Sequence, residues 1–170
     1  GGGLTWTYSY DALNRVVTQM NAASQRSTFS YDANGNVLVE QYVSGTEWVT
    51  YTYDALNRQL TMKDNGGTTT NTYTVRGEIA SQVQAGNYVL TYSYDNVGNR
   101  TLLIDPDGGR TTSTYTATNL VSTVKDPDKG VTTYQYDSVS QLTTMQTGLG
   151  LTRTYAYDLS GNATTQIDVN

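Results

Sequence analysis

The sequence predicts an all-β protein built from tandem hairpins, and three observations support that prediction. The composition favours pleated strands, because 30 of the 170 residues are Thr and 15 are Tyr, whereas Phe occurs once and Trp twice. A short motif that begins with a Tyr-Asp pair returns about every 21 residues. The apolar residues show no sustained 3.6-residue period, so we expect almost no helix.

One column of tyrosines anchors the repeat. Successive anchors are separated by 21, 22, 20, 21, 21, 21 and 21 residues. Eight repeats therefore cover essentially the whole sequence, and we expect residues 1–170 to form a single array of repeats. The anchors are Tyr10, Tyr31, Tyr53, Tyr73, Tyr94, Tyr115, Tyr136 and Tyr157.

A second aromatic column lies two residues before the anchor in six of the eight repeats. Phe29 fills a place that is otherwise Tyr, so the ring matters more here than the hydroxyl; Asn71 and Ser113 are the exceptions. Alternate residues of a strand share a face, so a first strand such as 132–136 places both rings on one face. We expect these rings to form a ladder that joins successive hairpins. The column consists of Tyr8, Phe29, Tyr51, Tyr92, Tyr134 and Tyr155.

A tight turn follows each anchor. In six repeats the next residue is Asp, whose short carboxylate reaches the backbone N–H two residues further on; Thr74 and Thr116 replace it in the other two. The fourth residue after the anchor is Gly, Asn or, once, Ser140, which fits a type I turn continued by a left-handed residue. The aspartates are Asp11, Asp32, Asp54, Asp95, Asp137 and Asp158, and the left-handed positions are Asn14, Gly35, Asn57, Gly77, Gly98, Asn119, Ser140 and Gly161.

A second strand, such as 36–40 or 141–145, completes each hairpin. Connecting turns at 64–67, 105–109 and 126–130 lead to the next repeat, and the last two contain both prolines of the chain. The expected total is about sixteen short strands. On the second strand we expect an inward face formed by Val16, Val37, Ile79, Val121 and Leu142.

Several functional classes are disfavoured by composition. The net charge is −5, and the seven Arg and three Lys are scattered singly, which argues against nucleic-acid binding and against an anionic membrane surface. No apolar run approaches 18 residues, so we expect no membrane insertion. His and Cys are absent, which excludes Ser-His-Asp and Cys-His catalysis and metal sites built on either residue. We expect no cofactor, no metal and no enzymatic activity.

The motif aspartates admit three interpretations: turn capping, a glycosidase carboxylate pair or calcium ligation. Six equivalent carboxylates favour capping, since a catalytic pair requires two carboxylates that differ from the others. The loops at 105–109 and 126–130 lack the twelve-residue EF-hand pattern. Arg15, Arg58 and Arg100 lie in or just after the turns, and we expect them to contact neighbouring turns and to form ion pairs rather than to bind a ligand.

The pattern Y-x-Y-D-x-x-G-N/R at this period resembles the RHS or YD-repeat family over nearly the full length. That family includes Rhs polymorphic toxins, shell components of ABC-type toxin complexes, wall-associated bacterial proteins and teneurins. The resemblance implies a continuous antiparallel sheet that curls into a hollow barrel, spiral shell or tube. It also implies a bacterial protein that is secreted or at the cell surface. The family's core segment is absent, and we expect the chain to be a slice of a longer array.

Two functional hypotheses follow. The first is a non-catalytic wall segment of an exported shell that encapsulates a toxin polypeptide, or of a self-assembling filament or tube. Its partners would be flanking repeats or other copies of the chain, which pair through edge strands. The alternative is an extracellular carbohydrate-binding or adhesion module, since exposed aromatic rings stack on sugars.

Overall fold

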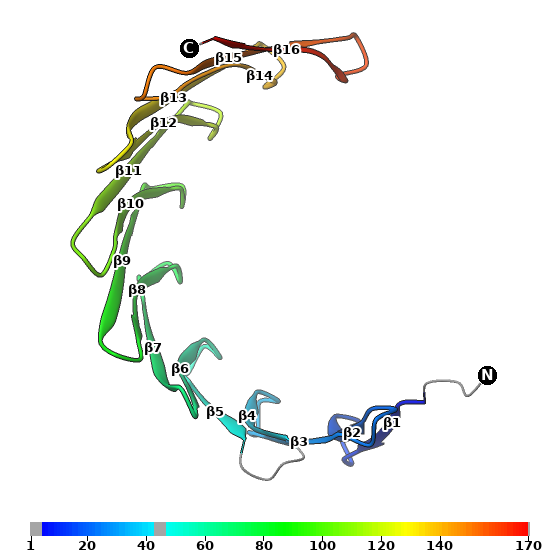
Figure 1. Cartoon of the computed structure of the whole chain (residues 1–170). Coiled ribbons are helices and arrows are strands. Elements are labelled where there is room, and N and C mark those ends of the chain that lie inside the picture. The colour runs from blue at the N-terminus through cyan, green and yellow to red at the C-terminus, as the bar shows by residue number, and fades with distance from the viewer. Residues whose placement is uncertain (1–4, 43–46, 170) are drawn as a thin grey trace. The chain divides into compact units, whose positions relative to one another are not determined.

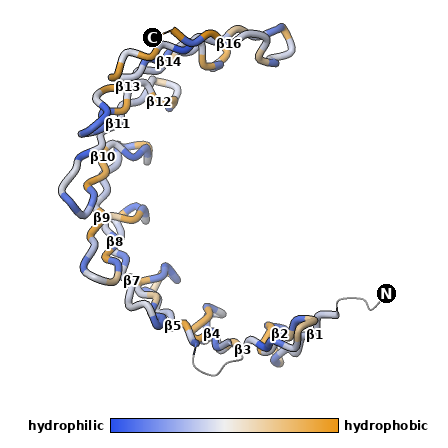
Figure 2. The backbone as a smooth tube through the Cα atoms, viewed as in Figure 1, coloured by the Kyte–Doolittle hydropathy of each residue, from blue (hydrophilic) through white to orange (hydrophobic). Residues whose placement is uncertain are grey.

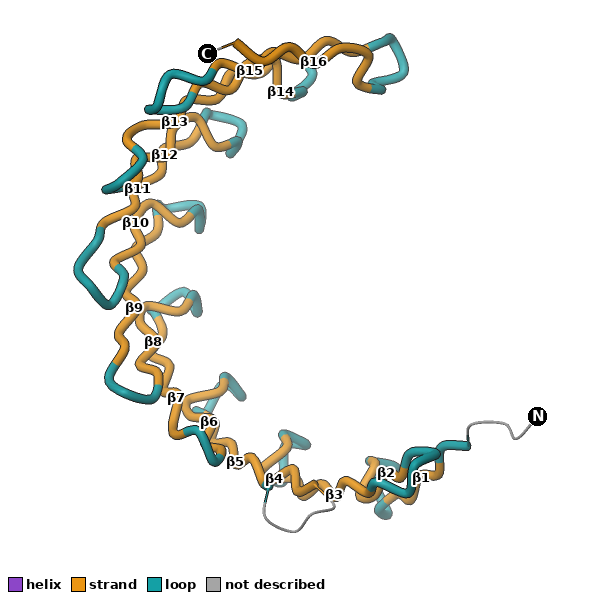
Figure 3. Tube along the Cα trace, viewed as in Figure 1, coloured by secondary structure: helices purple, strands orange, loops and turns teal. Residues whose placement is uncertain are grey.

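The all-β prediction is confirmed. The computed structural model describes residues 5–42 and 47–169, and in this part of the chain it contains sixteen strands and no helix (Figures 1 and 3). Within each of the two units described below, every neighbouring pair of strands is antiparallel and neighbours follow chain order. None of the described segments forms a helix with the length and hydrophobicity needed to cross a membrane.

Contacts divide the chain into two units, Gly1–Tyr88 and Val89–Asn170, which are described separately. Unit 1 contains four hairpins. Their strands are β1 (Thr7–Tyr10), β2 (Val16–Met20), β3 (Arg26–Tyr31), β4 (Val37–Tyr42), β5 (Trp48–Tyr53), β6 (Gln59–Asp64), β7 (Gly67–Tyr73) and β8 (Ile79–Gln84).

Unit 2 contains four more hairpins of the same kind. Its first strand, β9, begins at Tyr88, at the boundary between the units. Its strands are β9 (Tyr88–Tyr94), β10 (Arg100–Ile104), β11 (Arg110–Tyr115), β12 (Val121–Asp126), β13 (Gly130–Tyr136), β14 (Leu142–Gln146), β15 (Thr152–Tyr157) and β16 (Ala163–Val169).

Each hairpin carries an irregularity at its anchor tyrosine. In the first hairpin Ser9 lies opposite Thr18 but Tyr10 lies opposite Val16, so Val17 is an additional residue on the second strand. The same one-residue shift occurs at the anchor of every other hairpin. Such a bulge bends the strand and increases its local twist, and here it places the anchor directly before the turn.

The five second-strand residues expected on an inward face are each paired opposite an anchor tyrosine, so they lie on the face that carries the rings. They are half-buried, and no described hydrophobic side chain is fully buried. Within each unit, hydrophobic and hydrophilic stretches alternate along the tube (Figure 2). The ring face is therefore one side of a single-layer sheet and not the surface of an enclosed core. Closure into a barrel or tube stays a prediction.

Candidate functional site

The repeated turn is built on the motif aspartate. In the first repeat, Asp11 Oδ1 accepts hydrogen bonds from the backbone N–H groups of Leu13 and Arg15, both at 2.9 Å. The backbone N–H of Asn14 donates to the carbonyl of Asp11 at 3.0 Å. The predicted bond to the N–H two residues on is present in all six Asp repeats, and a second bond to the N–H four residues on accompanies it.

The second carboxylate oxygen binds the side chain of the fourth residue after the Asp in five of these turns. Arg15 Nε and Arg58 Nε donate at 2.7 Å, and an Asn amide donates in the other three. These bonds favour the ionised carboxylate. The backbone N–H of Arg15 is the chief cause that lowers the pKa of Asp11. In the other four turns, the chief cause that lowers the pKa of the Asp is the hydrogen bond donated by the side chain four residues further on; these residues are Asp32, Asp54, Asp95 and Asp158.

The left-handed residue is present in all eight turns, as the sequence predicts. Ser140, the least expected residue type, has φ 70°. A side chain with a Cβ is strained in this region, whereas Gly is not and Asn tolerates it. The φ values are 61° at Asn14, 92° at Gly35, 61° at Asn57, 99° at Gly77, 95° at Gly98, 63° at Asn119 and 83° at Gly161.

The two Thr repeats make the same turn with a hydroxyl. Thr116 Oγ1 accepts from the N–H groups of Thr118 at 3.3 Å and Leu120 at 3.1 Å. Thr74 accepts in the same way at 3.2 and 3.3 Å. In the repeat of Thr74, Asn71 stands in the aromatic column; it is 6 % exposed and donates to the carbonyl of Gln59.

Within each unit, the hydroxyl of an anchor tyrosine links its repeat to the repeat before it. Tyr31 Oη donates to the carbonyl of Val16 at 2.6 Å, and that carbonyl belongs to the first residue of the preceding second strand. The same link is present from Tyr53, Tyr73, Tyr115, Tyr136 and Tyr157, at 2.7–2.9 Å. Sequence reasoning missed this bond, although the signal was available: the anchor is Tyr in every repeat, while the other aromatic column tolerates Phe.

Two of the three turn arginines, Arg15 and Arg58, contact the next repeat, as expected. The Arg15 guanidinium lies 4.6 Å from the ring centroid of Tyr31, and it donates to the carbonyl of Asp32 at 3.1 Å. Arg58 lies 4.5 Å from the ring of Tyr73. Both also form ion pairs with the aspartate of their own turn, at 2.7 and 2.6 Å. Arg100 lies 5.9 Å from the ring of Tyr92. Cation–π contact therefore connects the turns of Arg15 and Arg58 to the following hairpin, whereas the ion pairs stay within one turn and Arg100 contacts its own hairpin.

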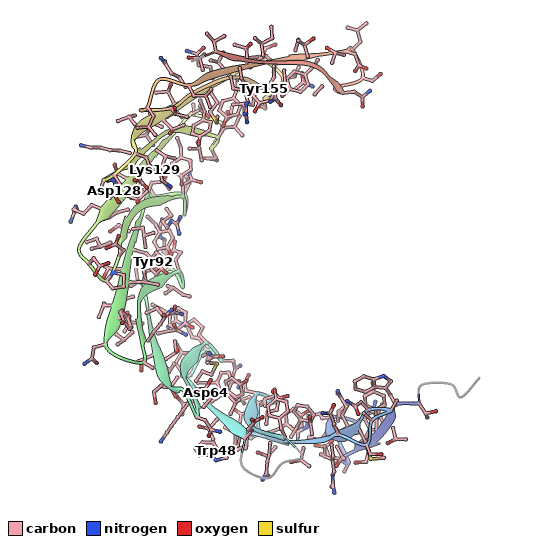
Figure 4. The ribbon with its side chains drawn as sticks, viewed as in Figure 1. Trp48, Asp64, Tyr92, Asp128, Lys129 and Tyr155 are labelled. Atoms are coloured by element: carbon pink, nitrogen blue, oxygen red, sulfur yellow. The ribbon has the colours of Figure 1, made fainter. Side chains whose placement is uncertain are left out.

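The second aromatic column shares the ring face with the anchors, because the two positions are two residues apart in one strand. Figure 4 labels Tyr92 and Tyr155 of this column, which lie on the same side of the unit 2 ribbon. Tyr8, at the edge strand, is 48 % exposed, whereas most of the others are half-buried against neighbouring hairpins.

The opposite face carries a threonine column that sequence reasoning also missed. The residue three before the anchor is Thr in all eight repeats. Thr28 lies opposite Thr18, and Thr133 lies opposite Thr123. Cross-strand hydroxyl pairs of this kind stabilise a sheet by roughly 0.2–1 kcal/mol each. The column is Thr7, Thr28, Thr50, Thr70, Thr91, Thr112, Thr133 and Thr154.

This arrangement fixes the geometry of the sheet and singles out no reactive group. The six motif carboxylates accept the same backbone bonds. Within residues 5–42 and 47–169, no three carboxylates gather closely enough to hold a metal ion. The motif aspartates are therefore equivalent in their backbone hydrogen bonds, which is expected of structural units.

Comparison with protein families gives one match, to the RHS repeat. It covers residues 10–47, 31–69, 73–110 and 115–152, which is more than half of the chain. No curated protein matches the sequence.

Among solved structures, similar folds occur in Tc toxin proteins. The TcdB2–TccC3 structure without its hypervariable C-terminal region has a TM-score of 0.60 and 17% identity, with 98% of this chain and 9% of that chain covered. The Photorhabdus luminescens Tc holotoxin pore has a TM-score of 0.59 and 20% identity, covering 97% of this chain and 9% of that one. The TcdB2–TccC3–TEV structure has a TM-score of 0.59 and 14% identity, covering 96% and 11%. At these identities the likeness shows a shared fold, and the chain spans about a tenth of those proteins.

Proposed function

Because the chain belongs to the RHS repeat family, we propose that it is a non-catalytic structural module, a wall segment of an exported bacterial shell or of a self-assembling extracellular filament. The observation that carries this proposal is the equivalence of the repeats. All eight turns have a left-handed residue at the same position, and all six motif aspartates cap their own turn. Residues that do the same work in every copy build an architecture and not a single active site.

The edge strands supply the means of assembly. Every residue of β1 is exposed in unit 1, and every residue of β16 is exposed in unit 2. An unpaired strand edge offers N–H and C=O groups to another strand. We expect flanking repeats of a longer chain, or other copies of this one, to pair there. The proposal extends to a shell that encloses a toxin polypeptide and to a secreted or cell-surface location; the shared fold with structures of Tc toxin proteins supports it.

Sedimentation of the 170-residue chain over a range of concentrations tests this assembly. We expect species larger than the 18.6 kDa monomer that grow with concentration. Ile167→Lys, on the exposed β16, should reduce them, because a charge on an edge strand disfavours pairing with another strand. Leu159→Lys is the matched control: it adds the same charge in a fully exposed turn and should leave the species unchanged. A compact monomer at every concentration would contradict the assembly.

The non-catalytic part of the proposal has its own test. A hydrolase substrate screen should detect no turnover by the purified chain. Activity that a single Asp→Asn change abolishes, while the five equivalent changes leave it intact, would show that one carboxylate has a private role and would overturn the proposal.

A further inference from the structure

Neighbouring turns within a unit contact one another through two positions. One is the left-handed residue of a turn. The other, which we call the exit residue, comes directly after the left-handed residue in the turn of the preceding repeat. In unit 1 the amide of Asn36 donates to Oδ1 of Asn57 at 2.8 Å, and in unit 2 the amide of Asn99 donates to Oδ1 of Asn119 at 3.0 Å. The exit residues are Arg15, Asn36, Arg58, Glu78, Asn99, Leu120, Gln141 and Asn162.

The two positions vary together along the sequence. An exit Asn is followed by a left-handed Asn in the next repeat at both of these contacts. An exit Arg, Glu or Gln is followed by a left-handed Gly every time, and Leu120 is followed by Ser140. The type of the exit residue therefore indicates which residue the next turn carries. The pairs with Gly are Arg15 and Gly35, Arg58 and Gly77, Glu78 and Gly98, and Gln141 and Gly161.

The space between two turns explains this match. A Cβ at Gly161 would lie 3.0 Å from Gln141 Nε2, which is closer than an ordinary van der Waals contact. A Cβ at Gly77 would lie 3.8 Å from Arg58 Nη1. A long exit side chain therefore takes up the place of the next left-handed side chain, whereas the shorter Asn leaves that place open and forms a hydrogen bond with the Asn that fills it.

The exit residue of the last turn and the left-handed residue of the first turn are both Asn. Asn162 donates to Asp158 at 3.0 Å, which uses one of its two amide N–H donors. Asn36 and Asn99 make the same bond to their own Asp and use the other N–H for the next repeat. They are half-buried, whereas Asn162 and Asn14 are exposed. A second chain that placed its Asn14 beside this turn would complete the hydrogen bonding of the Asn162 amide.

The threonine column gives the register of such a contact. Between β14 and β15, Thr144 lies opposite Thr154. Thr165 of β16 stands eight residues after its anchor, as Thr144 does, and Thr7 of β1 stands three residues before its anchor, as Thr154 does. Pairing of β16 with β1 of a second copy therefore places Thr165 opposite Thr7.

The same register provides an acceptor for the first anchor hydroxyl. Within each unit, an anchor donates to the carbonyl of the first residue of the preceding second strand. The first residue of β16 is Ala163, so its carbonyl is the equivalent acceptor for Tyr10 of a second copy. Tyr10 is 54% exposed, whereas the anchors that make this bond are half-buried.

We propose that β16 of one copy pairs with β1 of a second copy, and that Asn162 selects this partner by donating to Asn14 of the second copy. The pairing rests on the edge-strand assembly proposed above, and it continues the junction that joins repeats within each unit. The two copies contribute different edges, so the contact is heterologous. It builds an open filament or a closed ring and not a twofold dimer.

Disulfide trapping tests the pairing, because the chain has no Cys of its own. One chain carries Thr7→Cys, an isotope-labelled chain carries Thr165→Cys, and the two are mixed in a glutathione redox buffer. Directly opposite residues of antiparallel strands have Cα atoms about 4.5–5.5 Å apart, which suits a disulfide. By mass spectrometry we expect the mixed dimer to exceed either dimer of like chains about tenfold. Ser9→Cys in place of Thr7→Cys is the register control and should cross-link poorly, since diagonal neighbours are about 7–8 Å apart.

A double-mutant cycle on the same cross-link tests the Asn pair. Asn14→Gly keeps the left-handed turn, because other turns carry Gly at this position, and it should lower the yield of mixed dimer about three- to tenfold by removing one hydrogen bond. In chains that also carry Asn162→Gln, the change Asn14→Gly should alter the yield less than twofold. Asn119→Gly is the matched control. Its partner Asn99 lies in the same chain, so the yield should stay the same.

Three outcomes would overturn this pairing. The first is a predominance of dimers of like chains, which would mean that like edges meet. The second is an equal effect of Asn14→Gly with Asn or Gln at position 162, and the third is a loss of yield with Asn119→Gly as large as that with Asn14→Gly. If the chain still formed large species that Ile167→Lys reduces, the edge-strand assembly would stand and only its partner edge would be wrong. A monomer at every concentration would overturn both.

Discussion

Two adjacent repeats of unit 2 build the same turn with different chemistry. In the turn of Asp137, the backbone N–H of Asp137 donates to the backbone carbonyl of Gln141 at 3.0 Å, and the left-handed residue is Ser140. In the turn of Thr116, the equivalent backbone bond to Leu120 is 2.8 Å. The backbone course is therefore the same whether the first turn residue carries a carboxylate or a hydroxyl.

The side-chain bonds differ between these two turns. Asp137 accepts from Val139 and Gln141 at 3.0 and 2.9 Å, whereas the bonds accepted by Thr116 are 3.1 and 3.3 Å. Charge-assisted hydrogen bonds are shorter and stronger than neutral ones. The fold therefore requires a hydrogen-bond acceptor on the first turn residue. A negative charge on that acceptor strengthens the turn but is not essential to it.

Acid should give the largest effect, because it acts on several Asp turns at once. The pKa values of Asp11, Asp32, Asp54, Asp95 and Asp158 are lowered by hydrogen bonds in the folded chain. The unfolded value is about 3.9. Their stabilisation is therefore fully present above about pH 4 and is lost as the pH falls through the folded values below it.

Hydrogen exchange resolves this acid effect turn by turn. In unit 2, protection of the amides of Val97 and Asn99, which donate to Asp95, should fall in this pH window. The amides of Thr118 and Leu120, which donate to a hydroxyl, should keep their protection until the whole unit unfolds. Simultaneous loss at both turns would show that ionisation of the Asp is not what distinguishes them.

Removal of an anchor tyrosine should give the next largest effect, and it should be equal in the two classes of repeat. Tyr136 donates to Val121 at 2.9 Å in the Asp repeat, and Tyr115 donates to Arg100 at 2.8 Å in the Thr repeat. Each Tyr→Ala change should lower the free energy of unfolding by roughly 2–4 kcal/mol through lost ring packing and the lost bond. Each Tyr→Phe change should cost about 1 kcal/mol.

Urea unfolding of the four variants measures the contribution of the ring and the contribution of the hydroxyl to the free energy of unfolding. If Phe were as costly as Ala, the hydroxyl link between repeats would carry the energy and the ring would not. If Tyr115→Ala were nearly neutral, the Thr repeat would be held by other contacts and the shared role of the anchor would be wrong.

The turn was predictable from sequence because its causes are local. Asp137 reaches an amide two residues away, and the left-handed residue follows at a fixed distance, so a single repeat contains the information. The hydroxyl link of Tyr136 was not predictable in the same way, since its acceptor, Val121, is fifteen residues away and becomes adjacent only through strand register. The threonine column is readable from the sequence, since the residue three before the anchor is Thr in every repeat.

The smallest effect should come from the capping side chains themselves, and it tests the comparison most directly. Asp137→Ala removes two bonds to a carboxylate and should lower the free energy of unfolding by roughly 0.5–1.5 kcal/mol. Thr116→Ala removes two longer, neutral bonds from the backbone and an exposed bond with the Thr118 hydroxyl, and it should cost about half as much. Neither side chain has an ion-pair partner in its own turn, since the fourth residue on is Gln141 or Leu120. The extra hydroxyl bond of Thr116 can only raise the cost of Thr116→Ala, so a larger cost for Asp137→Ala reports the charge on the acceptor. Urea unfolding at pH 7 measures it, and a Thr116→Ala cost equal to or above that of Asp137→Ala would mean that the charge adds nothing to the turn.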